Sequence, residues 1–358
     1  MIAFLERIPV KIICWKTWVF EWTDIFRKRS LYQNIQWTRE QKEAFDQYWK
    51  KNYGKKISPR WHKLYQSING TFDAAYLPDV IYSTVVEPRI VPYYVGKTLS
   101  DKAIAEIFAK AVAVKIPKTI VLNSYGIFYN SNREVISQKD AVELLRKENV
   151  VVMKPTIGSS SGNGVQVIDI TDWDDKKIIN LLEQNGKNYI FQEKITQHDT
   201  FAALHPQSIN TIRLTTIATR NGVKHWPLAV RIGRGNSAVD NIHAGGLGAG
   251  VSDDGKLKEK AYGLGNCDRK ETYTKHPDTG VVFLNYQLEG IPRMIQEACM
   301  LHGHVPGVGA ISWDFTVSKE GDPIMIEANM LGQGMWFSQI VNEKGMSDMM
   351  LPLIRRNG

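Results

Sequence analysis

The sequence of 358 residues contains little cysteine and no long apolar run, and each absence excludes a class of protein. Its three cysteines, Cys14, Cys267 and Cys299, are too few and too widely spaced for a disulfide framework, which indicates a reducing compartment. The most apolar window, residues 8–26, contains four charged side chains and therefore predicts no membrane-spanning helix. We expect no secretory signal, because Glu6 stands where such a segment carries positive charge. These features predict a cytoplasmic globular protein.

Acidic residues are scarce only near the N-terminus. Residues 1–70 contain 14 Lys and Arg against 6 Asp and Glu, and this surplus of 8 equals the net charge of the whole chain. The same segment contains six of the ten tryptophans. A nucleic-acid partner is disfavoured, because no recognition motif accompanies the charge. Two alternatives remain: the tryptophans pack onto the rest of the protein, or residues 1–30 contact the inner face of an anionic membrane.

Apolar periodicity divides the sequence near residue 115. Helices are predicted over residues 3–29, over 38–51 behind a Thr-x-x-Gln capping box, and from Ser100 to a point before Lys115. Further strands are predicted at 119–122, 150–153, 165–168, 189–191, 211–219 and 224–232, and further helices at 138–147, 173–185 and 287–302. The Asn221-Gly222 pair predicts a hairpin. The fold class is therefore α+β (mixed α/β), with part of the sheet antiparallel.

A lysine ends one predicted strand and faces a loop rich in glycine and serine. Lys154 follows the apolar run 150–153, and the loop contains Ser159, Ser160, Ser161 and Gly162. An ammonium group supplies positive charge for a phosphate, and glycine lets backbone N–H groups approach it closely. No Gly-Lys-Ser/Thr follows, so this is not a Walker loop. The alternative is a flexible β-turn.

Near the carboxyl end, residues 310–314 and 323–329 predict a hairpin that carries three oxygen ligands. Glu327 and Asn329 are two residues apart, so their side chains share one face of a strand. Asp314 lies on the partner strand. Two carboxylates and one amide suit Mg²⁺, which takes its other ligands from water and phosphate. The alternative is an ordinary hairpin whose polar residues face water.

The run 189–195 is predicted to join two lobes and to offer backbone groups to the edge of a purine. Lysine, Gly/Ser loop, hinge, Asp and Glu-x-Asn, in this order, resemble the ATP-grasp superfamily over residues 96–345. The resemblance implies an ATP-grasp fold, in which two α+β lobes clasp ATP, with an N-terminal helical extension. It divides the chain into a basic, Trp-rich extension (1–95), a small lobe (96–200) and a large lobe (201–358).

The resemblance also implies which residues bind the cofactors ATP and Mg²⁺. The nucleotide-binding residues that it implies are Lys102, Lys154, Ser159, Ser160, Ser161, Gly162, Gln192, Glu193, Ile195 and Asp199. The two lysines would contact phosphates, the hinge would contact adenine, and Asp199 would hold the ribose. Gln192 departs from the family's pattern, since many relatives have glutamate there. Asp314, Glu327 and Asn329 look like ligands of two magnesium ions, which Mn²⁺ could replace.

Further residues resemble those with which related ligases hold an activated acyl group. Arg213, Arg231 and Asn241 are similar in order to residues that bind the γ-phosphate and acyl group in glutathione synthetases and ribosomal-protein glutamate ligases. The run 239–243 and the basic extension look most like the sugar-transfer-associated ATP-grasp proteins of exopolysaccharide and capsule synthesis. With Lys154, these three residues form the expected catalytic set, because the charges of Lys154, Arg213 and Arg231 would offset those of ATP and the incoming carboxylate.

The resemblance implies a ligase that releases ADP and phosphate. A small-molecule or glycan-precursor carboxylate would be activated as an acyl phosphate, and its acyl group would pass to an amine or another nucleophile. The expected substrate class is a sugar, glycan or peptide precursor. One alternative is an ATP-grasp kinase that phosphorylates a hydroxyl. A second is a protein without catalysis, whose basic N-terminus binds a membrane or nucleic acid. The expected location is cytoplasmic, at most peripheral to the inner face of the membrane.

Overall fold

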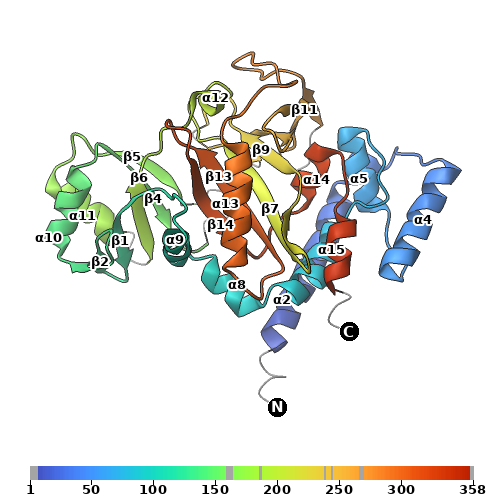
Figure 1. The fold of residues 1–358 in the computed structure, drawn as a ribbon, viewed down its shortest axis with the longest axis horizontal. Coiled ribbons are helices and arrows are strands. Elements are labelled where there is room, and N and C mark those ends of the chain that lie inside the picture. Colours follow the sequence, from blue (N-terminus) through green and yellow to red (C-terminus); the bar gives the residue numbers. More distant parts are fainter. Residues whose placement is uncertain are drawn as a thin grey trace.

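The computed structural model describes residues 7–158, 164–184, 188–237, 239–242, 245–265 and 270–354. Within them, helices at the N-terminus precede two β-sheets that lie next to each other, each with its own helices (Figure 1). The predicted mixed α/β class with an N-terminal helical region is confirmed. The predicted phosphate loop, Ser159, Ser160, Ser161 and Gly162, lies outside the described residues, as does Cys267.

The first part of the chain is helical. Its elements are α2 (Arg7–Arg27), α3 (Arg29–Tyr32), α4 (Arg39–Tyr53), α5 (Arg60–Asn69), α6 (Asp79–Ile81), the π-helical η1 (Tyr82–Val86), α7 (Glu87–Ile90), α8 (Tyr93–Leu99) and α9 (Lys102–Ala111). The predicted capping box is confirmed, because Gln41 N donates to Thr38 Oγ1 at 3.2 Å and Thr38 N to Gln41 Oε1 at 3.1 Å. Trp49 and Trp61 are buried, whereas Trp15 and Trp18 are exposed, so only part of the tryptophan set packs onto the rest of the protein.

The smaller sheet is wholly antiparallel and has a core of its own. Its order is β3-β2-β1-β6-β4-β5. The strands are β1 (Thr119–Ser124), β2 (Ile127–Tyr129), β3 (Val135–Ile136), β4 (Val150–Pro155), β5 (Gln166–Asp169) and β6 (Tyr189–Glu193). Helices α10 (Gln138–Arg146) and α11 (Asp175–Gln184) bury apolar side chains with those of the sheet, among them Leu145, Ile178 and Met153. This separate core lets the sheet form one wall of a cavity.

The larger sheet shares one continuous core with the N-terminal helices. Its order is β12-β11-β10-β9-β7-β13-β14, with β8 paired to β7. The strands are β7 (Thr211–Thr219), β8 (Gly222–His225), β9 (Leu228–Ile232), β10 (Leu247–Val251), β11 (Leu257–Gly263), β12 (Glu271–Tyr273), β13 (Ala310–Val317) and β14 (Pro323–Asn329). The helices that follow or flank them are α12 (Asp199–Ala202), α13 (Ile291–Gly303), α14 (Trp336–Asn342) and α15 (Ser347–Ile354).

The strand predicted over 224–232 is wrong in one respect, because it is two strands. The predicted hairpin at Asn221-Gly222 forms, and β8 pairs with the C-terminal end of β7. The strand is then interrupted at Trp226 and Pro227, and β9 pairs with the N-terminal end of β7. Proline has no N–H to donate to a ladder, and the buried Trp226 maintains the apolar pattern across the break.

Candidate active site

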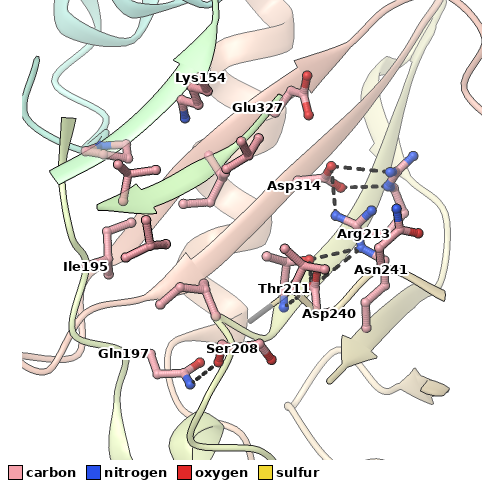
Figure 2. A pocket seen from close by; sticks show the side chains of 18 of the residues that line it. Lys154, Ile195, Gln197, Ser208, Thr211, Arg213, Asp240, Asn241, Asp314 and Glu327 are labelled. Atoms are coloured by element: carbon pink, nitrogen blue, oxygen red, sulfur yellow. Dashed lines mark hydrogen bonds and ion pairs between the residues drawn. The ribbon is translucent and has the colours of Figure 1, made fainter. Parts of the chain in front are cut away.

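A cavity of about 610 Å³ lies between the two sheets. The predicted site residues that line it are Lys102, Lys154, Gln192, Glu193, Ile195, Arg213, Arg231, Asn241, Asp314, Glu327 and Asn329. Figure 2 shows Lys154 on a strand of the small sheet and Asp314 and Glu327 on strands of the large sheet. Asp199 is not among the described residues that line the cavity. It is exposed on α12, where its carboxylate pairs with Lys319.

Lys154 brings a buried positive charge into this cavity from β4. Its position opposite Ile190 of β6 is set by the strand register, and the residue is 6% exposed. Burial lowers the pKa of Lys154 to about 8, with a further contribution from the nearby Lys102, while Glu327 acts in the opposite direction. An anion bound in the cavity would therefore stabilise the charged form of this lysine.

Lys102 connects the N-terminal end of α9 to the large sheet. Its Nζ lies 2.9 Å from Glu327 Oε1 on β14. Two contacts hold this helix end against the end of β4: Lys102 N donates to Thr156 O at 3.0 Å, and Thr156 Oγ1 donates to Asp101 Oδ2 at 3.2 Å. Asp101 also caps the helix by accepting a bond from Ala103 N at 2.8 Å. The two lysines thus reach the cavity from one connected unit.

Asp314 is held by two arginines from neighbouring strands. It lies opposite Arg213 in the β13–β7 ladder, and Arg213 Nε is 2.6 Å from Asp314 Oδ1. Arg231 Nη2, on β9, is 2.9 Å from Asp314 Oδ2. Burial alone would raise the pKa of Asp314, but the two guanidinium groups outweigh it and hold that pKa below its usual value. Asp314 is therefore a buried, ionised carboxylate.

The three predicted metal ligands come together. Asp314 lies opposite Glu327 across the β13–β14 ladder, and Asn329 Nδ2 donates to Asp314 Oδ2 at 3.2 Å. The described residues contain no group of three or more His, Cys, Asp or Glu that could hold a metal ion. Two carboxylates and an amide oxygen are nevertheless a donor set that fits a hard divalent cation, and the side chain of Glu327 is 27% exposed toward the cavity.

Gln192 is a further residue that lines the same cavity. Its Nε2 donates to Pro117 O at 3.2 Å and to Thr119 Oγ1 at 3.4 Å, which identifies the amide nitrogen. Its Oε1 is buried and has no hydrogen-bond partner among the described residues. The side chain of Glu193, in contrast, accepts a bond from Lys118 N at 2.9 Å. A buried acceptor without a donor fits a ligand that carries an amino group.

Asp240 was not predicted as a site residue, although it lies beside the predicted Asn241. Its Oδ2 accepts a hydrogen bond from Thr211 N at 2.9 Å and another from Thr211 Oγ1. The same hydroxyl accepts one from Arg231 Nε at 3.0 Å. Asp240 and Thr211 therefore fix the direction of the Arg231 guanidinium. Asp240 and Thr211 are far apart in sequence, so no local pattern joins them. A search for carboxylates close in sequence to the predicted Arg231 and Asn241 is the one signal that could have found Asp240.

A second cavity, of about 480 Å³, adjoins the first and shares Gly332, Gly334 and Trp336 with it. It lies between α2, α5 and the segment from α6 to α8. Its acidic lining residues are Glu21, Asp24, Asp79 and Glu87. Burial raises the pKa of Glu87 to about 7 and that of Asp79 to about 6. The same cause, with the charges of Asp79 and Asp24, raises the pKa of Glu21 to about 8.

The two lobes enclose a cavity that is lined by Lys102, Lys154 and the hairpin that carries Asp314 and Glu327. This arrangement defines an ATP-grasp protein. More narrowly, the chain belongs to the family described as sugar-transfer associated ATP-grasp, whose sequence model matches residues 83–352. Family membership supports an ATP-dependent ligase, and ATP-grasp enzymes use ATP with divalent metals. The N-terminal residues 1–82, with α2 to α6, lie outside the matched region.

Comparison with solved structures finds distant similarity of fold. D-alanyl-alanine synthetase A from Vibrio cholerae is 10% identical with a TM-score of 0.45, and the match covers 73% of this chain and 66% of that one. L-amino acid ligase from Bacillus licheniformis is 14% identical with a TM-score of 0.39, covering 75% and 49%. The chain thus spans about half to two thirds of the length of these structures. No curated protein matches the sequence.

Proposed function

We propose that this protein activates a carboxylate with ATP as an acyl phosphate and then transfers the acyl group to an amine. The observation that carries the proposal is the convergence of Lys154 with Asp314 and Glu327, which are far apart in sequence, on one cavity. The cavity volume of about 610 Å³ lies within the usual range for small-molecule sites. Family membership supports ATP-dependent ligase chemistry in general.

In this proposal, the nucleotide lies along the small sheet. The orphaned Oε1 of Gln192 would accept a hydrogen bond from the adenine amino group, beside backbone groups of Glu193 and Ile195. Lys102 and Lys154 would bind phosphates, together with the loop 159–163. A ribose contact by Asp199 remains a prediction, and it requires this carboxylate to leave Lys319.

The large sheet would hold the reacting groups. Asp314, Glu327 and Asn329 would bind magnesium, which offsets phosphate charge during transfer. A carboxylate oxygen of the substrate attacks the γ-phosphorus, and the bond from that phosphorus to the ADP oxygen breaks. Arg213 and Arg231, with Asn241, would hold the transferred phosphoryl group. Because Asp240, Thr211 and Asp314 already orient Arg231, its charge needs no reorganisation at that moment.

The second step completes the ligation. The amine nitrogen attacks the acyl carbon, inorganic phosphate leaves with the electrons of the broken C–O bond, and the nitrogen loses a proton. Because the family is associated with sugar transfer, we propose that the substrates belong to sugar, glycan or peptide precursors of a polysaccharide. We also propose that the reaction takes place in the cytoplasm, where ATP is available.

The test is a screen of carboxylate and amine pairs with ATP and Mg²⁺, in which the release of phosphate is measured. Each active carboxylate is then incubated with hydroxylamine in place of the amine. A hydroxamate, formed together with ADP and phosphate, supports the acyl phosphate. A phosphorylated alcohol without a hydroxamate would instead identify a kinase, and binding of no nucleotide at all would overturn both activities.

A further inference from the structure

Helix α2 packs against the protein on one side and exposes large apolar side chains on the other. Its inward residue Ile25 is 2% exposed, whereas Trp15 on the outward side is 63% exposed. Phe20, which is 64% exposed, and Ile13 also line the second cavity. The other exposed large apolar residues of this helix are Ile12, Ile13, Trp18, Val19 and Phe26. The described residues include eighteen exposed large apolar side chains, and nine of them lie on α2 and α8. The two on α8 are Tyr94 and Val95. An exposed apolar concentration of this kind marks an interaction surface.

The charges of α2 are separated between the same two sides. Its acidic residues, Glu21 and Asp24, line the second cavity. Lys11 and Lys16 are exposed. At 100° per residue, these two lysines lie on either side of the stripe formed by Trp15 and Val19. The exposed residues Ile12, Trp15, Val19 and Phe26 lie between the two lysines, so the outward side is apolar along its middle and basic along its margins.

This arrangement matches the surface of an anionic membrane. Tryptophan is enriched at the boundary between lipid headgroups and acyl chains, and basic side chains extend from there to lipid phosphates. Among the described residues, no helix is both long and apolar enough to cross a bilayer. Figure 1 shows the N-terminal end of α2 protruding at the lower side of the molecule, near α8.

We propose that the outward side of α2 binds an anionic membrane peripherally, with Trp15 in the middle of the apolar stripe and Trp18 at its margin, both at the level of the headgroups, and with Lys11 and Lys16 beside lipid phosphates. The apolar stripe supplies affinity, and the lysines select anionic over neutral lipid. The proposal does not depend on the reaction catalysed, because it uses only α2 and its neighbour. Helix α2 lies outside the matched family region, residues 83–352, whereas α8 lies inside it.

The test is co-sedimentation of the full chain with vesicles of phosphatidylcholine, with and without phosphatidylglycerol. We expect binding to the mixed vesicles, weaker binding to the neutral ones, and release by salt. The double substitution Trp15→Ser and Trp18→Ser should weaken binding at least tenfold. Lys16→Gln should weaken it about fivefold, because one basic residue near an anionic surface contributes about that factor.

Matched controls come from the turn between β1 and β2 and from helix α10, far along the chain from α2. Tyr125, 71% exposed, is changed to Ser, and Lys139, whose side chain is 85% exposed, is changed to Gln. Neither control should alter sedimentation, and circular dichroism checks that all variants are folded. Equal partitioning of the wild-type protein and the double tryptophan variant would overturn the proposal. So would a dimer in sedimentation velocity that the double variant abolishes while vesicles bind neither form, since a second copy would then cover α2.

Discussion

The two adjoining cavities share Gly332, Gly334 and Trp336 but differ in the partners of their buried carboxyl groups. In the cavity between the sheets, arginines pair with Asp314 and keep its pKa low. In the cavity under α2, Glu87 accepts hydrogen bonds from Gly332 N at 2.9 Å and Gln333 N at 3.4 Å, but burial outweighs them and raises its pKa to about 7. Burial pushes the pKa of both carboxyls upward, so the partner decides the outcome.

This difference separates two uses of a buried acid. Asp314 is charged at neutral pH and serves as the counter-charge for two arginines, so it is part of an electrostatic framework. Glu87 and Asp79 stay protonated to higher pH and connect elements of the fold through hydrogen bonds, as Tyr65 donates to Asp79 Oδ2 at 2.7 Å. Removing charge should consequently harm the first cavity and be tolerated by the second.

The largest expected effect follows removal of the charge of Asp314. Asp314→Asn leaves the buried guanidinium groups of Arg213 and Arg231 without a carboxylate, which should lower the free energy of unfolding by about 3–5 kcal/mol. Chemical denaturation measures this loss. The matched variant Asp79→Asn in the acidic cavity should lose far less at pH 8. Equal losses for both variants would contradict the comparison.

Removal of the charge of Lys154 should abolish most activity. We expect Lys154→Ala to slow ATP-dependent phosphate release roughly a hundredfold or more, because charge stabilisation in a closed site is worth that much. The exposed Lys118 provides a control, since only its backbone contacts Glu193. Lys118→Ala should retain activity. A Lys154 variant that keeps near-complete phosphate release with authentic substrates would show that this lysine has no role in transfer.

The acidic cavity should make stability depend on pH. Between the usual carboxyl pKa and the raised value of about 7, the folded protein holds a proton on Glu87 that the unfolded chain releases. The free energy of unfolding should therefore fall as pH rises from about 5 to about 7, by about 2–3 kcal/mol for this residue. Glu87→Gln should reduce that slope in denaturation at a series of pH values. An unchanged slope would mean that Glu87 is ionised in the folded protein.

The smallest effect concerns proton uptake by Lys154 on nucleotide binding. Its pKa of about 8 means that part of this group is neutral in the free protein at slightly alkaline pH. Bound phosphate favours the ammonium form, so ATP affinity should fall as pH rises above about 8, by at most about tenfold per pH unit. Calorimetric titration at several pH values measures this, and Lys154→Arg should remove the dependence. Constant wild-type affinity across this range would contradict phosphate contact by Lys154.

Several features could be predicted because they depend on neighbouring residues. The Thr38 capping box, the hairpin at Asn221-Gly222 and the shared face of Glu327 and Asn329 each follow from spacing along one segment. The domain boundaries after residues 95 and 200 stay predictions. The break between β8 and β9 could not be read from apolar pattern, because buried Trp226 continues the pattern across it.

Local sequence thus determined the mixed α/β class, the strands that carry the predicted site residues and the residue types available for phosphate and metal, whereas helices such as α5, α14 and α15 and strands β10 to β12 were not predicted. Tertiary structure decided which groups meet: Asp314 with Arg213 and Arg231, Lys102 with Glu327, and Asp199 with Lys319 outside the cavity. It also decided that Trp49 is buried and Trp15 exposed within one basic segment. The physical reason is that hydrogen-bonded local structure depends on near neighbours, whereas burial and charge pairing depend on strand register and on surfaces contributed by distant segments.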